Sequence, residues 1–347
     1  MKIFKTIRDK IAGFIRAVKK GAVSFVKNAP AVILVIAAAV TVTGVCNYVM
    51  LRRSRPELRT SEVWSQGSDV SFRHVAVYPK KEFGRGDVDS VRKSLQGIVD
   101  TSAGIRRKKS DKAIDPEGWV DCYCAFAAAS LSVEHNGQDM DGEADVYAVG
   151  GDFKAFHPME FLAGGFLPVK AVDKYQIVLN DELCWKFFSS YDVIGAKVTL
   201  LDKEYTVTGV VREHDDLKFR AYVYYDSLNE PGSIRSYEAM IPEQIKGAAM
   251  MDVRNSLPGY DMSSPEHYVV SVTGRYGIGS VIDNMLPPGE TSAMLSDYDL
   301  PFWEMSAQKV TSEMFMWVVI TGVGCIIILV TSIVLLRGIP VKKSGRI

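Results

Sequence analysis

The sequence is poor in the residues that most often carry chemistry. Five cysteines and five histidines stand among 347 residues. No Walker A stretch occurs, so the chain does not hydrolyse ATP by that route. Residues 274–279 read GRYGIG, in which the glycines are crowded but lack the dinucleotide-binding spacing. We therefore predict no catalytic residue, no cofactor and no ATP-hydrolysing activity in this chain.

The cysteines do not form an obvious disulfide framework. Cys46 and Cys325 fall in long apolar runs, which leaves an odd number, three, for the rest of the chain. Cys122 and Cys124 alternate along an expected strand, too close for an easy bridge within it. We expect buried free thiols.

Net charge is also lacking, since 41 Lys and Arg balance 41 Asp and Glu. The balance hides an asymmetry. Residues 1–30 carry eight basic side chains and one acid, and residues 337–347 carry four basic side chains and no acid. Residues 53–312 carry 28 basic and 39 acidic side chains, a net charge of about −11. An acidic middle argues against binding to nucleic acid, which requires a basic face.

Two uncharged apolar runs separate these blocks, at residues 29–51 and 314–336. A membrane span needs roughly 20 apolar residues, so both runs predict transmembrane helices. The first starts too late, is too long and lacks a clear cleavage site for a signal peptide. Basic flanks of membrane spans stay in the cytoplasm. We therefore expect a plasma-membrane protein whose two termini are cytoplasmic and whose acidic middle is extracytoplasmic.

The first 28 residues have a helical pattern of their own. Apolar side chains recur at helical spacing, at Phe4, Ile7, Ile11, Phe14, Val18 and Phe25. Basic side chains lie off this stripe. The pattern predicts an amphipathic helix on the inner membrane surface over residues 1–28. A solvated basic leader is the alternative.

Strand-like and helix-like patterns are mixed over residues 61–312, as in an α+β domain. Residues 70–79 alternate as a strand, 86–100 carry a helical apolar face, and 119–137 predict a strand or hairpin. Residues 177–211 predict strand, helix and a tight two-strand ribbon, with Asn180 or Asp181 as the helix cap. The order is strand-helix-strand, a β-rich insert, then a second strand-helix-strand unit, which indicates an α+β fold.

The best candidate for a metal site is the stretch EHDD, Glu213 to Asp216. It lies beside a predicted strand end, but no second His or Cys cluster is evident in the sequence. We favour a solvated acidic loop and predict no metal.

One long segment resembles a known family. Residues 145–168 read DVYAVGGDFKAFHPMEFLAGGFLP, and residues 192–211 read DVIGAKVTLLDKEYTVTGVV. This combination resembles the extracytoplasmic core domain of MacB/FtsX-type ABC transporter permeases. The family's motif positions are filled here by Asp152, Phe153, Phe161, Gly164, Gly165, Ile194, Gly195, Lys197, Tyr205, Val207, Gly209 and Val210. The resemblance covers roughly residues 30–340 and is sharpest over 146–225.

The resemblance implies two lobes. A porter-like lobe would comprise about residues 68–140 and 226–310, and a sabre-like lobe about residues 141–225. Such permeases usually have one helix before the outer domain and three after it, whereas this sequence has one on each side. The implied function is that of a noncatalytic permease-type subunit, short in form, whose outer domain couples membrane-helix motion to extracytoplasmic events. Its partners would be a separate ABC ATPase and either a longer permease or a second copy.

We interpret the motif residues as structural rather than chemical. Gly195 and Gly209 suit turn or close-packing positions where a Cβ would interfere. In the second apolar run, Gly322 and Gly324 are small enough to let helices approach closely, so we expect a helix–helix contact there. The competing hypothesis is a membrane-tethered binding or scaffold module that has lost transport.

Overall fold

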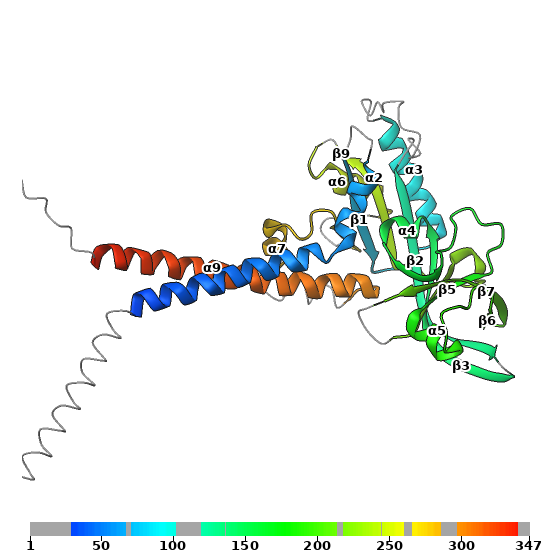
Figure 1. Cartoon of the computed structure of the whole chain (residues 1–347). Coiled ribbons are helices and arrows are strands. Elements are labelled where there is room, and N and C mark those ends of the chain that lie inside the picture. The colour runs from blue at the N-terminus through cyan, green and yellow to red at the C-terminus, as the bar shows by residue number, and fades with distance from the viewer. Residues whose placement is uncertain are drawn as a thin grey trace, which may run out of the picture. The chain divides into compact units, whose positions relative to one another are not determined.

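The computed structural model describes residues 29–66, 71–101, 119–135, 137–213, 218–243, 245–259, 266–285 and 297–338. The amphipathic helix predicted over residues 1–28 and most of the basic tail 337–347 lie outside these ranges. The chain divides into a globular unit, residues 55–311, and a helical unit formed by the residues before and after it (Figure 1).

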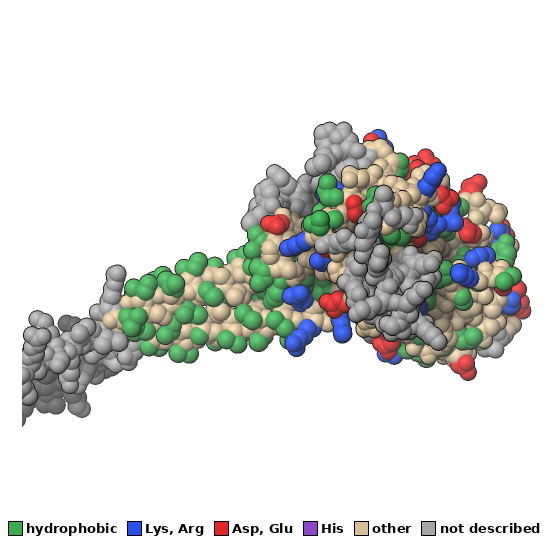
Figure 2. All heavy atoms as spheres, turned by 90° about the horizontal axis from the view of Figure 1, so that it is seen from above, with side chains coloured by type: hydrophobic (Ala, Val, Ile, Leu, Met, Phe, Trp, Pro, Cys, Tyr) green, Lys and Arg blue, Asp and Glu red, His purple; other side chains and the backbone are tan. Residues whose placement is uncertain are grey.

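The helical unit contains two long apolar helices. The first spans Ala29–Arg53 with a mean hydropathy of 2.3, and the second belongs to α9, Phe302–Gly338, whose apolar stretch has a mean hydropathy of 2.8. Only 11% and 6% of these stretches are buried, so neither is the core helix of a soluble protein. Hydrophobic side chains cover the paired helices in Figure 2. Exposed apolar side chains over this length are what a lipid bilayer solvates.

The two apolar helices approach each other through small residues. A Cβ on Gly44 would lie 2.4 Å from Thr321 Oγ1, and a Cβ on Gly324 would lie 2.2 Å from Thr41 Oγ1. A Cβ on Gly322, in contrast, would meet no atom within 4 Å. Gly324 is thus a contact within this chain, whereas Gly322 faces open space.

Within the described residues, ten strands form one sheet in the globular unit. The strands are β1 (Ser71–Pro79), β2 (Val120–His135), β3 (Gln138–Gly151), β4 (Glu160–Gly164), β5 (Gln176–Asn180), β6 (Lys197–Leu200), β7 (Lys203–Arg212), β8 (Arg220–Tyr224), β9 (Ser236–Glu243) and β10 (His267–Ser271). Their order is β10-β1-β9-β2-β3-β8-β5-β7-β4, with β6 pairing β2 and β7.

The helices of the globular unit are short apart from α3. They are η1 (Pro56–Arg59), α2 (Thr60–Trp64), α3 (Arg85–Thr101), α4 (Phe153–Phe156), α5 (Asp181–Phe188), η2 (Tyr225–Ser227), α6 (Ala248–Ser256) and α7 (Ile278–Met285). The predicted cap of α5 is Asn180, whose side chain accepts from the backbone N–H of Leu183 at 3.1 Å. The same oxygen also accepts from the N–H of Arg220 at 3.0 Å, which ties α5 to β8.

Both faces of the sheet are buried, because strand residues alternate between two cores. On the first face, Tyr123 and Ala125 of β2 join a core that includes Val88, Val91 and Leu95 of α3. On the second face, Cys122 and Cys124 of the same strand join Tyr147, Phe153 and the ring of Trp303. The start of α9 therefore covers one face of the sheet and α3 covers the other.

This architecture confirms the predicted α+β class, with apolar helices on both sides of a β-rich domain. Residues 119–137 were predicted to form a strand or a hairpin. They contain the long strand β2, which forms a hairpin with β3. Strands β10, β1, β9 and β2 come from the residues predicted for the porter-like lobe, and β4 to β8 from those predicted for the sabre-like lobe. The division into two lobes stays a prediction.

Candidate functional site

Three consecutive residues at the start of α9 pack against the globular unit. The helix begins after Pro301, whose carbonyl accepts from the backbone N–H groups of Glu304 and Met305 at 3.0 and 3.1 Å. Phe302, Trp303 and Glu304 follow, and each contacts a different set of side chains. We call this segment, residues 301–304, the α9 root.

Glu304 makes a buried ion pair with Arg275, which follows β10. Arg275 donates two hydrogen bonds to the carboxylate, at 2.6 and 2.5 Å. Tyr78 of β1 donates a third at 3.0 Å. Glu304 is 1% exposed and Arg275 is 4% exposed. Burial alone would lower the pKa of Arg275, but the Glu304 carboxylate raises it above its usual value, so the guanidinium is charged.

The two aromatic residues of the α9 root pack on the second face of the sheet. The Phe302 ring lies 5.5 Å from the ring of Tyr147, and the Arg220 guanidinium stands 3.9 Å above Phe302. Trp303 lies 5.5 Å from Phe153 and 4.6 Å from His157, between ring centroids. These contacts add specific aromatic and cation–π geometry to the burial.

A pocket of about 530 Å³ opens beside Phe302. Its lining residues come from β2, β3, the segment before β8 and the start of α9, and they are Phe126, Asp145, Tyr147, Lys218, Tyr298, Asp299, Leu300, Phe302, Met305 and Gln308. The volume falls within the range of roughly 300–1,000 Å³ that is usual for ligand sites. Aromatic walls with one Lys and two Asp side chains suit an amphipathic molecule.

The α9 root is the beginning of a long helix. Helix α9 runs without a break over 37 residues, and its residues up to Thr311 belong to the globular unit. Glu304 cannot leave its site without uncovering the Arg275 charge. Displacement of the helix start is therefore coupled to β1 and to the segment after β10.

The predicted motif residues lie at the start of α4, in β4, β6 and β7, and in the segments beside these strands. Asp152 precedes α4, and its backbone N–H donates to the carbonyl of Asp121 at 2.9 Å. Phe153 is buried on the second face. Tyr205 and Val207 of β7 are fully buried, with the Tyr205 hydroxyl donating to Ser227 Oγ at 3.1 Å. Lys197 is exposed and pairs with Glu204 at 3.0 Å.

The motif glycines fall into two kinds of position. Gly195 has a φ of +89°, a left-handed conformation that favours glycine. Gly164 and Gly209 permit close backbone approach, since a Cβ on Gly164 would lie 2.1 Å from the carbonyl oxygen of Thr208 and one on Gly209 would lie 2.2 Å from that of Gly165. A Cβ on Gly165 itself would meet nothing within 4 Å. These residues shape the β4–β7 pair.

The EHDD and GRYGIG stretches were considered above as possible chemical sites. Their residues that the structure describes make hydrogen bonds and ion pairs within the protein. Glu213 of the EHDD stretch accepts from Arg220 at 2.7 Å and from Tyr222 at 2.5 Å. His214, Asp215 and Asp216 lie outside the described residues. Arg275 of the GRYGIG stretch makes the ion pair with Glu304.

Sequence reasoning missed the α9 root entirely. Its one local signal is an acidic residue ten positions before the second apolar run, where an unpaired charge would be unfavourable if the helix entered lipid. Its partner Arg275 is 29 positions away and follows a different strand. Pairing the two residues requires the register of the sheet, which local sequence patterns do not supply.

Comparison with known proteins gives structural similarities only. No family model matches the sequence, and no curated protein matches it. Among solved structures, the periplasmic region of MacB from Actinobacillus actinomycetemcomitans aligns at 16% identity and a TM-score of 0.41, over 63% of this chain and 96% of that one. The chain is similar to the outer domains of ABC-type permeases.

Two further solved structures also align with this chain at low identity and low TM-score. The extracellular domain of the noncanonic ABC-type transporter YknZ from Gram-positive bacteria aligns at 10% identity and a TM-score of 0.38, over 57% of this chain and 99% of that one. A domain of a putative permease protein from Porphyromonas gingivalis aligns at 10% identity and a TM-score of 0.33, over 59% of this chain and 88% of that one.

Replacing Gly209 by Ala is expected to destabilise the globular unit by about 1–3 kcal/mol, because the added Cβ overpacks against Gly165. The matched control is Gly165→Ala, which adds the same methyl group on the opposite side of the same contact, where the structure leaves space. The measurement is the unfolding midpoint of the full chain in detergent. Equal midpoints for the two variants would contradict the assignment of Gly209 as a close-packing position.

Replacing Glu304 by Gln is expected to lower the free energy of unfolding by about 3–5 kcal/mol, because it leaves the Arg275 charge buried without its counter-charge. The control is Glu204→Gln, which removes the exposed partner of Lys197 and should cost less than about 1 kcal/mol. Denaturant unfolding of both variants measures the difference. A Glu304→Gln variant as stable as the control would show that the ion pair does not hold the helix start.

Proposed function

We propose that the chain is a noncatalytic, permease-type subunit of an ABC transporter complex, in which the globular unit lies outside the cytoplasm and is coupled to the membrane helices. The observation that carries the proposal is the α9 root. A single helix is locked into the sheet by Glu304 and Arg275 and continues as a membrane span. A device of this kind transmits helix movement to a folded domain.

Two sequence features add the transporter context. The motif over residues 146–225 resembles that of MacB/FtsX-type permeases. The charge asymmetry favours cytoplasmic termini and an extracytoplasmic globular unit. We propose that a separate ATPase subunit supplies the energy, and that a longer permease or a second copy of this chain completes the membrane part.

A second function is favoured by the pocket beside Phe302. The chain would then be a membrane-tethered binding module, and the pocket of about 530 Å³ would take an amphipathic ligand. The two functions differ in their partners. A permease-type subunit requires an ATPase and further membrane helices, whereas a tethered binding module requires neither.

Labelling with a membrane-impermeant maleimide tests the orientation. Lys170 is exposed on the globular unit, so an introduced Lys170→Cys is expected to react in intact cells. A Ser344→Cys change in the basic tail is expected to react only after permeabilisation. The unsubstituted protein gives the background from the native cysteines. The reverse pattern, with Ser344→Cys reactive in intact cells and Lys170→Cys protected, would overturn the orientation.

Association is tested by Gly322→Leu, which adds bulk to the open face of α9. We expect a loss of copurified partner on the order of tenfold, or about 1.4 kcal/mol, because small residues let helices approach closely in lipid. Val330→Leu is the control at another exposed apolar position of the same helix. Purification in mild detergent from the native membrane measures the complex.

Gly324→Leu separates this effect from disturbance within the chain. Gly324 contacts Thr41 of the first apolar helix, so its substitution is expected to alter the pairing of the chain's own helices and lower its stability in detergent. A chain that purifies as a monomer without ATPase or permease, and is indifferent to Gly322→Leu, would favour the tethered binding module.

A further inference from the structure

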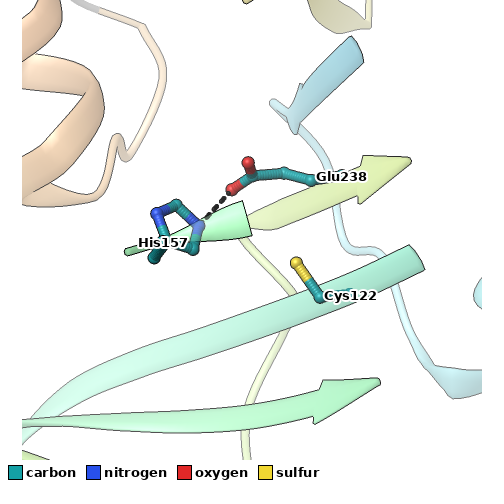
Figure 3. Close-up of side chains that lie close together, drawn as sticks. All are labelled: Cys122, His157 and Glu238. Carbon is teal, nitrogen blue, oxygen red and sulfur yellow. Dashed lines mark hydrogen bonds and ion pairs between the residues drawn. The ribbon is translucent and has the colours of Figure 1, made fainter. Parts of the chain in front are cut away.

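Three side chains with metal-binding atoms meet on the second face of the sheet. Cys122 of β2 stands directly opposite Glu238 of β9 in the antiparallel ladder. His157 follows the short helix α4. The Cys122 sulfur, a carboxylate oxygen of Glu238 and a ring nitrogen of His157 all lie within 4.8 Å of one another. Figure 3 shows the three side chains pointing toward one another.

The carboxylate in this cluster is held from both sides. Glu238 Oε1 lies 3.0 Å from His157 Nε2 and accepts a hydrogen bond from Ser236 Oγ at 2.9 Å. Glu238 Oε2 lies 2.7 Å from His74 Nε2. The other ring nitrogen of His74 lies 3.4 Å from Thr60 Oγ1. Each oxygen is thus oriented before any ligand binds.

The cluster is also shielded from solvent. Glu238 is 1% exposed, as is Cys122. A thiol, an imidazole and a carboxylate that are brought together inside the protein are groups that a metal cation can bind.

We propose that Cys122, His157 and Glu238 bind a divalent transition-metal ion of the zinc type, with His74 and Ser236 orienting the carboxylate. A thiolate, an imidazole and a carboxylate form a ligand set that suits Zn²⁺. Binding replaces the contact between His157 and Glu238 by one bond from each to the ion. It also displaces the thiol proton of Cys122 to solvent, and the proton on the His157 nitrogen that faces Glu238 moves to the other ring nitrogen or to solvent.

The geometry requires only small movements. With usual Zn–S and Zn–N distances, neighbouring ligand atoms of a tetrahedral ion are roughly 3.3–3.6 Å apart. The present limit of 4.8 Å is about one ångström from that arrangement. The His157 side chain is 14% exposed, in contrast to 2% for Glu238, so it marks the route by which the ion and a fourth, water ligand enter.

An ion at this site would also stiffen the α9 root. The His157 ring lies 4.6 Å from the ring of Trp303, and Trp303 directly precedes Glu304. Fixing His157 on a metal fixes the surface against which Trp303 packs. This consequence depends only on the globular unit and holds whether or not the chain belongs to a transporter.

The chain supplies its own control in Cys124. This residue lies on the same strand and the same face as Cys122, and it is equally buried. Its sulfur contacts the carbonyl oxygen of Ala125 at 3.3 Å, and it is not one of the three clustered ligands. Cys122→Ser and Cys124→Ser therefore make the same chemical change in the same core, but only the first removes a ligand.

The test uses the full chain, purified in detergent and stripped of metal, with Zn²⁺ and Co²⁺ as probes. We expect one ion per chain, a rise in the unfolding temperature with Zn²⁺, and a thiolate-to-cobalt charge-transfer band with Co²⁺. The band should be lost in Cys122→Ser and kept in Cys124→Ser. His157→Gln should weaken binding by at least about tenfold, in the range reported for loss of metal-site groups.

Two results would overturn the proposal. One is the absence of both the cobalt band and the zinc-dependent rise in unfolding temperature in the unsubstituted chain. The other is a band that Cys124→Ser removes as completely as Cys122→Ser. If Cys122→Ser fails to fold, His157→Gln decides the question, because its side chain is partly exposed and its loss leaves both buried cysteines in place. Unchanged zinc affinity in that variant counts against the site.

Discussion

The globular unit depends on a constraint imposed by its sheet, which has cores on both faces. A polar side chain that points into either core loses its water and must find a partner inside the protein. Glu304, Glu238 and Glu213 meet this requirement, each with cationic or imidazole partners from another element. These pairs connect segments that the chain order keeps apart.

The Glu304 pair has the widest consequence because it lies at the start of the longest helix. At about 1.5 Å per residue, the 37 residues of α9 extend over roughly 55 Å. An unbroken helix is stiff along its axis, so its first turn cannot slide independently of the residues that follow. The aromatic contacts of Phe302 and Trp303 fix the rotation of that turn about the helix axis. The Glu304 carboxylate fixes its position along the axis.

Local patterns in the sequence were sufficient for the elements and for some of the packing. The apolar runs predicted the two long helices, and the tight ribbon predicted within residues 177–211 turns at Leu201 and Asp202, which have φ values of +48° and +58°. The glycine motif predicted close approach at Gly209, where a Cβ would lie 2.2 Å from a carbonyl oxygen. Each of these features is encoded within a few neighbouring residues.

The sites depend on contacts between distant residues, and the same patterns did not predict them. His157 and Glu238 are 81 positions apart, and His74 and Glu238 are 164 positions apart. Cys122 meets Glu238 only because β2 and β9 pair in one particular register. A register shift of one residue would turn Cys122 to the opposite face of the sheet and separate the ligands. The Glu213–Asp216 stretch, in contrast, looked like a site because its residues are consecutive.

Helix α9 reverses the distribution of side chains found in a soluble helix. Near its start Glu304 is almost fully buried, whereas Ile326 and Leu329 are 64% and 61% exposed. In water, the exposed aliphatic side chains would destabilise the helix, and in lipid, an unpaired Glu304 would. One helix satisfies both conditions only if its beginning is enclosed by folded protein and its apolar stretch by hydrocarbon. The burial of α9 follows this division, because Ala307, Val310, Thr311 and Met314 are still buried and the continuous exposed apolar surface comes after them.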